Sequence, residues 1–258
     1  MTSDLTVVDI TTRAGLPDAH VRVMQALHQL GEIVPTSRWC LIGGLMVEVL
    51  LASRDGMMLR PTDDGDFVGD VVADRSALRK LAHALLDLGF DEKPTGWDGD
   101  IGVRFRHPVS HVYIDVLMPE NSSRLRNVLP ARPQKRSLEA PGTDYAIVTA
   151  TDFAVTFAAD HQPLAVRVPS VCGALYAKAS AWKRIKNASD PNKHLQDAAA
   201  LLTVATLQEL TAAPKAFTKR LVWLDEELTD ANSVGWQYVE ALSRRDAIAR
   251  LAAAVTTI

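Results

Sequence analysis

The segment from Trp39 to Asp66 constrains the fold more than any other part of the chain. It passes from a short apolar stretch through Gly43 and Gly44 into an apolar helix-like stretch, and it ends on the acidic pair Asp64 and Asp66. This order predicts a strand, a glycine turn, a helix and a second strand. Because alternate residues of a strand share a face, we expect Asp64 and Asp66 to project together toward the glycine turn.

This segment has the chemistry of a site for Mg²⁺ and a nucleoside triphosphate. Two neighbouring carboxylates are the hard oxygen ligands that Mg²⁺ prefers, usually together with substrate phosphates. Glycines leave backbone amides uncovered, and amides at the start of a helix attract phosphate. Alone, a double glycine is often only a tight turn and an acidic loop only a solvated connection. The combination in one short unit favours the binding site.

Composition places the chain among ordinary globular proteins. Its 258 residues are 47% hydrophobic and 23% charged, enough for one large domain or two smaller ones. The formal charge of −3 is no general signature of nucleic-acid binding, so a site for a polyanion must be local. Cys40 and Cys172 are expected as buried thiols in a reducing compartment. With no signal-peptide pattern and no apolar run long enough to span a bilayer, we expect a cytoplasmic protein without a membrane partner.

A third carboxylate follows in the next part of the chain. Helices are predicted at residues 17–30 and 75–88, and strands at residues 90–93, 101–106 and 111–117, with a corner at His107-Pro108. In the last strand, alternation places Asp115 on one side with Tyr113 and Leu117. A lone aspartate in an apolar strand is costly unless it is paired or bound to a metal. Asp115 is therefore a candidate ligand, and an edge-strand aspartate that faces water is the alternative.

The second half of the chain divides into an irregular and a helical part. Residues 119–150 look irregular or β-like and carry a basic run, which is either solvated surface or a guide for an RNA backbone. The basic run consists of Arg124, Arg126, Arg132, Lys135 and Arg136. After a strand at residues 164–168, helices are predicted at residues 170–186, 193–202, 207–212, 214–228 and 233–254. We predict an α+β protein, with a mixed-sheet domain and flanking helices over residues 1–168 and a helical domain that completes the active-site cleft over residues 169–258.

Residues 60–66, RPTDDGD, fit the pattern R-x-T-x-D-x-D that follows a Gly-Gly turn. The chain thereby resembles the nucleotidyltransferase superfamily with its polymerase-β-like fold. Its layout is similar to the branch that holds the AbiEii-type and MenT-type toxins of bacterial toxin–antitoxin systems. In that branch a lysine, a basic cluster and a K/R-x-x-x-D-like helix start follow, and the places are taken here by Lys178, Lys183-Arg184 and residues 193–197, KHLQD. The resemblance spans roughly residues 39–202.

The resemblance assigns roles to individual residues. It implies that Asp64 and Asp66 hold metal ions, that Gly43 and Gly44 lie against the triphosphate, and that Lys178 contacts the phosphates. The remaining implied positions are Asp197, which would complete the site, Asp115 as a third metal ligand, and Arg60 and Thr62 on the nucleotide or the metal loop. Two positions depart from the pattern. Gly65 stands where an apolar residue is usual, and Leu45 follows Gly-Gly where Ser or Thr is frequent.

The residues at the C-terminal positions also have simpler interpretations. Lys178 could be a lysine that snorkels to the surface, and Asp197 could be an acid favoured by the dipole of a helix N-terminus. His194 precedes Asp197 by three residues, but an isolated histidine at a helix start is more often a polar surface residue, and it is not adopted as a ligand.

The activity implied is Mg²⁺-dependent transfer of a nucleotide from an NTP to RNA, in particular to the 3′ end of tRNA, by a toxin that a cognate antitoxin protein restrains. Two alternatives stay open. The acceptor could be the hydroxyl of a small molecule or of a protein side chain, or the chain could be a catalytically inactive binding module of the same fold.

Overall fold

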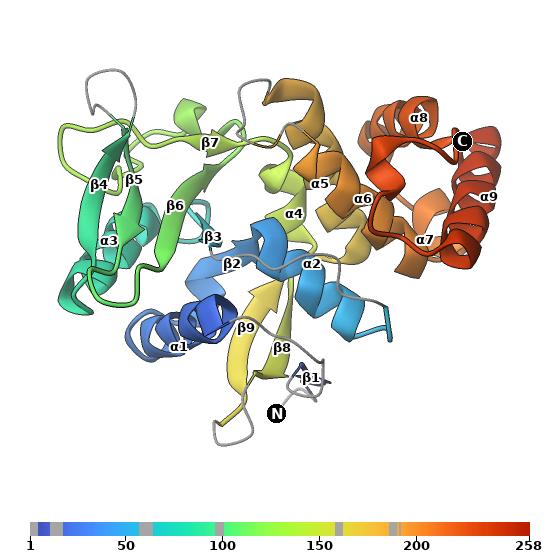
Figure 1. Ribbon diagram of the computed structural model, residues 1–258. Coiled ribbons are helices and arrows are strands. Elements are labelled where there is room, and N and C mark those ends of the chain that lie inside the picture. Colours follow the sequence, from blue (N-terminus) through green and yellow to red (C-terminus); the bar gives the residue numbers. More distant parts are fainter. Residues whose placement is uncertain are drawn as a thin grey trace.

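The computed structural model describes residues 5–10, 18–56, 64–95, 101–157, 162–185, 190 and 192–258. Strands and helices in these ranges form two sheets with helices packed around them (Figure 1). The strands are β1 (Thr6–Asp9), β2 (Trp39–Ile42), β3 (Asp64–Gly69), β4 (Asp91–Thr95), β5 (Ile101–Arg106), β6 (Tyr113–Pro119), β7 (Glu139–Ala140), β8 (Thr151–Thr156) and β9 (Leu164–Val168). The helices are α1 (Asp18–Ile33), α2 (Gly43–Ala52), α3 (Ala77–Asp87), α4 (Thr143–Val148), α5 (Val171–Arg184), α6 (Lys193–Val204), α7 (Leu207–Thr211), α8 (Lys215–Leu228) and α9 (Ala241–Thr257).

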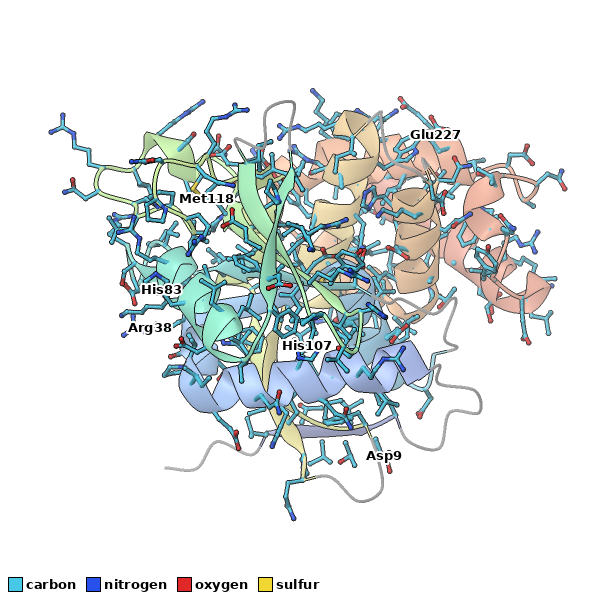
Figure 2. The ribbon with its side chains drawn as sticks, turned by 60° about the vertical axis from the view of Figure 1, so that its left-hand side comes forward. Asp9, Arg38, His83, His107, Met118 and Glu227 are labelled. Atoms are coloured by element: carbon cyan, nitrogen blue, oxygen red, sulfur yellow. The ribbon has the colours of Figure 1, made fainter. Side chains whose placement is uncertain are left out.

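The larger sheet carries the acidic strand near its middle. Its strand order is β2-β3-β6-β5-β4, with β7 paired to the end of β6. Strands β3 and β6 are parallel, whereas the pairs β2–β3, β6–β5 and β5–β4 are antiparallel. The corner between β5 and β6 lies at His107, labelled in Figure 2, whose backbone N–H donates to the Val112 carbonyl (2.9 Å). The prediction of an α+β fold with a mixed sheet is confirmed.

Helices α1 and α3 pack against this sheet because each presents an apolar face. In α3, Leu78, Leu81, Ala82 and Leu85 recur at helical spacing and are all buried. Packing explains why glycine stands at position 65, where the sequence pattern usually has an apolar residue. A Cβ at this position would lie 3.1 Å from Val23 of α1. The missing side chain therefore lets α1 lie close against β3, on the face opposite to the carboxylates.

Several short elements near the start and in the middle of the chain were not predicted. Strand β1 pairs in parallel with β8, and β8 pairs with β9 to complete the small sheet. Residues 119–150, predicted as irregular or β-like, contain the short 3₁₀ helix η2 (Ser122–Arg124), β7 and α4. Strand β1 is four residues long and buries only Val8, so its own sequence carries almost no pattern. Its partner lies far along the chain.

The C-terminal part is helical in all its described elements, as predicted. Helix α5 begins where Pro169-Ser170 signals a start, and Ser170 Oγ accepts a hydrogen bond from the Gly173 N–H (3.1 Å). The predicted helix at residues 233–254 is wrong in its first third, which forms the 3₁₀ helix η3 (Val234–Trp236) ahead of α9. Trp236 is buried there and donates from Nε1 to the Leu228 carbonyl (2.9 Å), so tertiary packing overrides the helical pattern.

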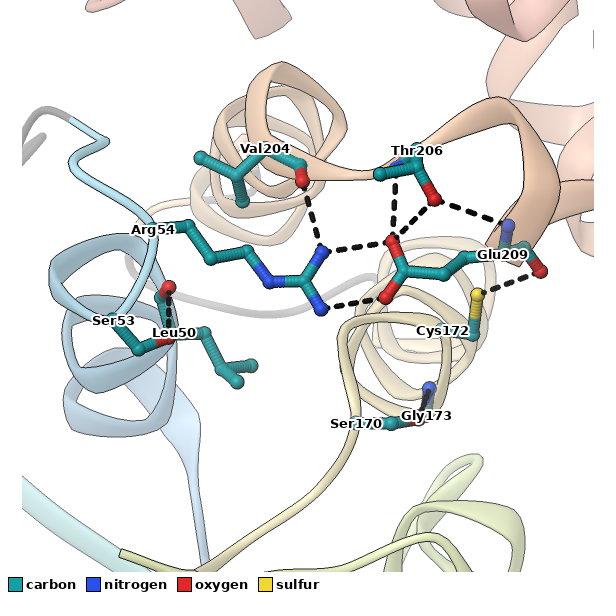
Figure 3. Close-up of polar contacts among 9 residues, drawn as sticks. All are labelled: Leu50, Ser53, Arg54, Ser170, Cys172, Gly173, Val204, Thr206 and Glu209. Atoms are coloured by element: carbon teal, nitrogen blue, oxygen red, sulfur yellow. Dashed lines mark hydrogen bonds and ion pairs between the residues drawn. The ribbon is translucent and has the colours of Figure 1, made fainter. Parts of the chain in front are cut away.

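Helix α2 connects the sheet to the C-terminal helices. Residues 45–51 of this helix are all buried, because it packs against β3 on one side and against α6 on another. Just after α2, Arg54 forms a fork on the Glu209 carboxylate of α7, with Nη1 2.7 Å from Oε2, and also donates to the Val204 carbonyl (3.1 Å; Figure 3). The division into domains at residue 168 stays a prediction. In the part of the chain that the structure describes, no helix is long and apolar enough to cross a membrane.

Candidate active site

Three aspartates lie together on the two parallel strands at the middle of the larger sheet. In the register of β3 and β6, Asp66 is directly opposite Asp115, and Asp64 is opposite Tyr113. Because Asp64 and Asp66 are two residues apart, all three carboxylates belong to one face of the sheet. Strand β6 lies between β3 and β5, so the interpretation of Asp115 as an edge-strand residue facing water is wrong.

The glycine turn lies directly against Asp66. Gly43 has a φ of +73°, a conformation that favours glycine, and a Cβ there would stand 2.0 Å from Asp66 Oδ2. Glycine at this position therefore makes room for the carboxylate. Helix α2 begins at the same residue, so its first turn lies next to Asp66, and its N-cap residue Ile42 makes no side-chain hydrogen bond to that turn. Gly44 is the second residue of α2, whereas Leu45 is buried in the core.

Arg104 of β5 is a site residue that the sequence analysis missed. It forms a fork on the Asp115 carboxylate, with Nε 2.8 Å from Oδ1 and Nη2 2.7 Å from Oδ2, and its Nη2 lies 3.8 Å from Asp64 Oδ2. Its guanidinium also stands 5.5 Å from the ring centroid of Tyr113. The hydrogen bonds to Asp115 raise the pKa of Arg104 above its ordinary value. The sequence contained a signal for this contact, because Arg104 lies in the predicted strand 101–106 and the next predicted strand contains Asp115, an aspartate in need of a partner.

Asp66 is the carboxylate with the least favourable surroundings. Burial raises its pKa to about 6, and the negative charge of Asp115 adds to the shift, followed by that of Asp64. The positive charges of Lys178 and Lys193 act in the opposite direction. A cation placed beside Asp66 would relieve this repulsion, which makes Asp66 the centre of the electrostatics of the site.

A cleft of about 220 Å³ lies between these acids and the C-terminal helices. Asp66, Asp115 and Gly43 line it from the sheet side, and Lys178 of α5 and Lys193 at the start of α6 line it from the other side. The remaining lining is largely apolar and comes from α2, β6, β7, α5 and the residues beside them. It includes Met46, Leu117, Leu138, Ala177, Ala181 and Ile185, with His194 at the lysine side. The cleft therefore joins two aspartates on the sheet side, two lysines on the helix side and an apolar surface between them.

Lys178 and Asp197 form a buried ion pair beside the cleft. Lys178 Nζ lies 2.6 Å from Asp197 Oδ2, and the two side chains are 5% and 3% exposed. The interpretation of Lys178 as a snorkelling surface lysine is therefore wrong. Asp197 is the fifth residue of α6 and is buried against this lysine, and its favourable interaction with the helix dipole stays a prediction. Asp197 holds Lys178 at the wall of the cleft, and their roles toward phosphate stay predictions.

Not every residue of the predicted site can be placed. Arg60 and Thr62 lie outside the described residues. The basic run is partly committed elsewhere, because Arg132 Nε lies 2.7 Å and Lys135 Nζ 2.8 Å from the Glu92 carboxylate of β4. Those two cations are consequently engaged in an ion-pair network on the far strands of the sheet.

The aspartates fit a divalent cation by their chemistry and positions. Among the residues that the structure describes, no three His, Cys, Asp or Glu side chains stand together as a ready-made metal site. Asp115 is held by Arg104, whereas Asp64 is about one-third exposed at the open side. These carboxylates occupy neighbouring strand positions, and the pKa of the central one, Asp66, is raised. A cation such as Mg²⁺ would bind their oxygens and stabilise their ionised form. Their assignment as its ligands stays a prediction.

The contact between Arg104 and Asp115 predicts how Mg²⁺ stabilises the protein. The variant Arg104→Gln leaves three carboxylates without their neighbouring cation, so Mg²⁺ should raise the unfolding temperature of this variant more than that of the wild type. Thermal unfolding with and without MgCl₂ measures the difference. Arg106→Gln, two residues along β5, is the matched control and should respond like the wild type. Equal shifts in all three proteins would contradict the assignment of these acids.

Comparison with known proteins gives distant structural similarity. No family model matches the sequence, and no curated protein matches it. The chain is similar to the crystal structure of an antigenic nucleotidyltransferase-like protein from Paracoccidioides brasiliensis, with 17% identity over 78% of this chain and 84% of that one and a TM-score of 0.46. It is also similar to the solution structure of the antibiotic-resistance factor ANT(2'')-Ia, with 15% identity over 79% and 96% of the two chains and a TM-score of 0.42. The function proposed below is argued from the geometry of the cleft.

Proposed function

We propose that the protein is a nucleotidyltransferase that transfers a nucleotide from an NTP to a hydroxyl group of RNA. One observation carries the proposal: Asp66 of β3 and Asp115 of β6 line one cleft with Gly43 at the start of α2 and with Lys178 and Lys193, and Asp64 lies on the same face of β3. Phosphoryl chemistry of this kind needs positioned charges more than covalent catalysis, and the cleft supplies charges of both signs.

Each part of the cleft has a role in this reaction. Asp64 and Asp66 would hold the divalent cation, with Asp115 as a third ligand once Arg104 moves away. The acceptor hydroxyl would lose its proton and attack the α-phosphorus of the NTP, the bond between the α-phosphorus and the bridging oxygen of the β-phosphate would break, and pyrophosphate would leave. The bound cation would supply charge neutralisation of the phosphates and a lower pKa of the hydroxyl. Lys178 and Lys193 would bind the phosphates as point charges, and the amides at Gly43 and Gly44 would donate to them. The apolar lining would hold the nucleobase.

The acceptor and the biological role are proposed from the sequence resemblance. They are the 3′ end of tRNA and a growth-arresting toxin that a separate antitoxin restrains. If this is so, production of the wild-type protein in a bacterial host should arrest growth, whereas Asp66→Asn should not, and co-production of the protein from the adjacent gene should relieve the arrest.

Labelled NTPs test the reaction directly. Purified protein, MgCl₂ and total tRNA are incubated with each labelled NTP in turn, and RNA is separated from free nucleotide. We expect labelled tRNA with at least one NTP and none with Asp64→Asn or Asp66→Asn. Label on a small hydroxyl compound or on protein, with tRNA inert, would move the acceptor to that class. If no acceptor is labelled, the protein is a binding module without catalysis. The Arg104–Asp115 and Lys178–Asp197 ion pairs favour this interpretation, because they engage a carboxylate and a lysine that the reaction would need.

A further inference from the structure

Aromatic rings and cations alternate across the surface where α5 and α8 pack together. The residues of this aromatic–basic surface are Trp182 and Lys183 of α5 and Lys219, Arg220 and Trp223 of α8. Both tryptophans are half-buried, and Lys219 is exposed. The surface lies at the upper end of the helical part, near Glu227, which Figure 2 labels.

Short distances join these side chains into one array. Lys183 Nζ lies 4.3 Å from the ring centroid of Trp182 and 5.9 Å from that of Trp223, so this lysine stands between the two indoles. Lys219 Nζ is 5.2 Å and Arg220 Cζ is 5.3 Å from the ring centroid of Trp223. Three cations therefore lie near one half-buried indole.

The array is anchored at one end and open at the other. Arg220 is held in place, because its Nε donates to Ser180 Oγ (3.2 Å) and its Nη1 to the Ala216 carbonyl (3.2 Å). Lys183 has one carboxylate neighbour, Glu227, at 3.7 Å, and that carboxylate is 41% exposed. A contact of this kind is weak, so Lys183 can exchange it for a phosphate.

This combination fits single-stranded nucleic acid. Unpaired bases stack on aromatic rings whatever their sequence, and lysine and arginine between the rings neutralise the phosphates that link the bases. A base stacked on Trp223 is expected to interact more strongly with the indole than a lysine 5.2 or 5.9 Å from its centroid does. The incoming base can therefore displace Lys183 or Lys219 toward the backbone phosphate. A duplex, whose bases are stacked inside, offers no base to the indoles.

Helix α5 carries both the surface and one wall of the cleft. Ala177, Lys178 and Ala181 line the cleft, whereas Trp182 and Lys183 project from other faces of the same helix, because an α-helix has about 3.6 residues per turn. A strand that stacks on Trp182 and Trp223 would therefore be held outside the cleft. The basic run at residues 124–136 is the weaker candidate, since Arg132 and Lys135 are engaged with Glu92.

We propose that the aromatic–basic surface of α5 and α8 binds an unpaired segment of the RNA acceptor outside the cleft. The inference rests on the proposed function for its acceptor, but the surface is tested by binding alone. It names Trp182 and Trp223 as stacking residues and Lys183 and Lys219 as the phosphate contacts.

Fluorescence anisotropy with a short labelled single-stranded RNA, without NTP or Mg²⁺, tests the surface. We expect Trp223→Ala to weaken binding about 10-fold, and Trp223→Phe, which keeps a ring, to retain most of the affinity. The pair Lys183→Gln and Lys219→Gln should weaken binding and lower the salt dependence of the affinity. Tyr238→Ala and Arg245→Gln remove an exposed ring and an exposed cation from another part of the helical region and should leave binding unchanged.

The possible outcomes distinguish RNA binding by the aromatic–basic surface from nucleotide transfer in the cleft. RNA binding that is unchanged in Trp223→Ala, or equal binding of a duplex and a single strand, would overturn the inference even if the protein labels RNA. Binding that depends on Trp223 and Lys183, in a protein that transfers no nucleotide, would keep the surface and overturn the proposed function. Far-ultraviolet circular dichroism of every variant verifies that the helices are intact.

Discussion

Asp66→Asn is expected to reduce nucleotide transfer by about 1,000-fold or more and at the same time to stabilise the protein at neutral pH. The loss of activity follows because Asp66 is central among the three carboxylates, and charge stabilisation of several kcal/mol corresponds to about that factor. Because a proton on Asp66 competes with Mg²⁺, the Mg²⁺ concentration needed for half-maximal wild-type activity should increase as the pH falls below about 6, the raised pKa of Asp66 in the metal-free protein. Initial rates of RNA labelling at a series of Mg²⁺ concentrations, between acidic and neutral pH, measure both effects.

The gain in stability follows from the direction of the pKa shift. Between about pH 4, its ordinary value, and about 6, folded Asp66 keeps a proton that the unfolded chain has lost. The free energy of unfolding therefore falls as the pH rises through this window, and above it the ionised Asp66 lowers stability by roughly 2 to 3 kcal/mol. Asparagine has the same shape without the charge, so its advantage should be present near pH 8 and absent near pH 4.

Urea unfolding of the metal-free proteins at the two pH values measures this difference. Asp64→Asn is the matched control, because Asp64 lies on the same strand but at the open side of the site, and its replacement should change stability little. Equal stability of Asp66→Asn and the wild type near pH 8 would contradict the strained surroundings inferred for Asp66. Functional sites commonly contain groups that lower the stability of the unliganded protein, and the repulsion around Asp66 would be an example.

Sequence predicted those parts of the site that depend on local spacing. Asp64 and Asp66 share a face because strand periodicity fixes it, and the turn at Gly43 precedes a buried helix as the apolar pattern indicates. Asp115 belonged to the same category, since alternation in 111–117 placed it away from the buried Ile114 and Val116. The position of Asp115 directly beside Asp66 could not be predicted from local periodicity, because it depends on the parallel register of β3 and β6.

The contacts that set the electrostatics could not be predicted in this way. Arg104 meets Asp115 through strand register, and Lys178 meets Asp197 through the packing of α5 on α6. From the sequence alone, Lys178 had a simpler interpretation as a surface lysine and Asp115 as an edge-strand acid, and Arg104 had no predicted role. The same limit applies to the small sheet, whose β1 has too few buried residues to be recognised without β8.

Lys178→Met is expected to destabilise the folded protein by about 3 to 5 kcal/mol, because it leaves Asp197 buried without the lysine that compensates its charge. The double variant Lys178→Met with Asp197→Leu should recover most of this loss, since an apolar pair of similar volume avoids the cost of desolvating two charges. Urea unfolding at neutral pH of the wild type, both single variants and the double variant gives the coupling free energy.

Lys183→Met, one turn further along α5, is the matched control for the loss of a lysine. Its partner Glu227 lies 3.7 Å away at the surface, so the expected cost is within about 1 kcal/mol. Equal losses in Lys178→Met and Lys183→Met would contradict a buried, mutually dependent pair.

The stable double variant then separates the structural role of the pair from a role in catalysis. If Lys178 binds phosphate, this variant should fold like the wild type, bind NTP weakly and label RNA poorly. If it labels RNA at the wild-type rate, the pair serves only to join α5 to α6, and Lys193 is left as the cation of the cleft.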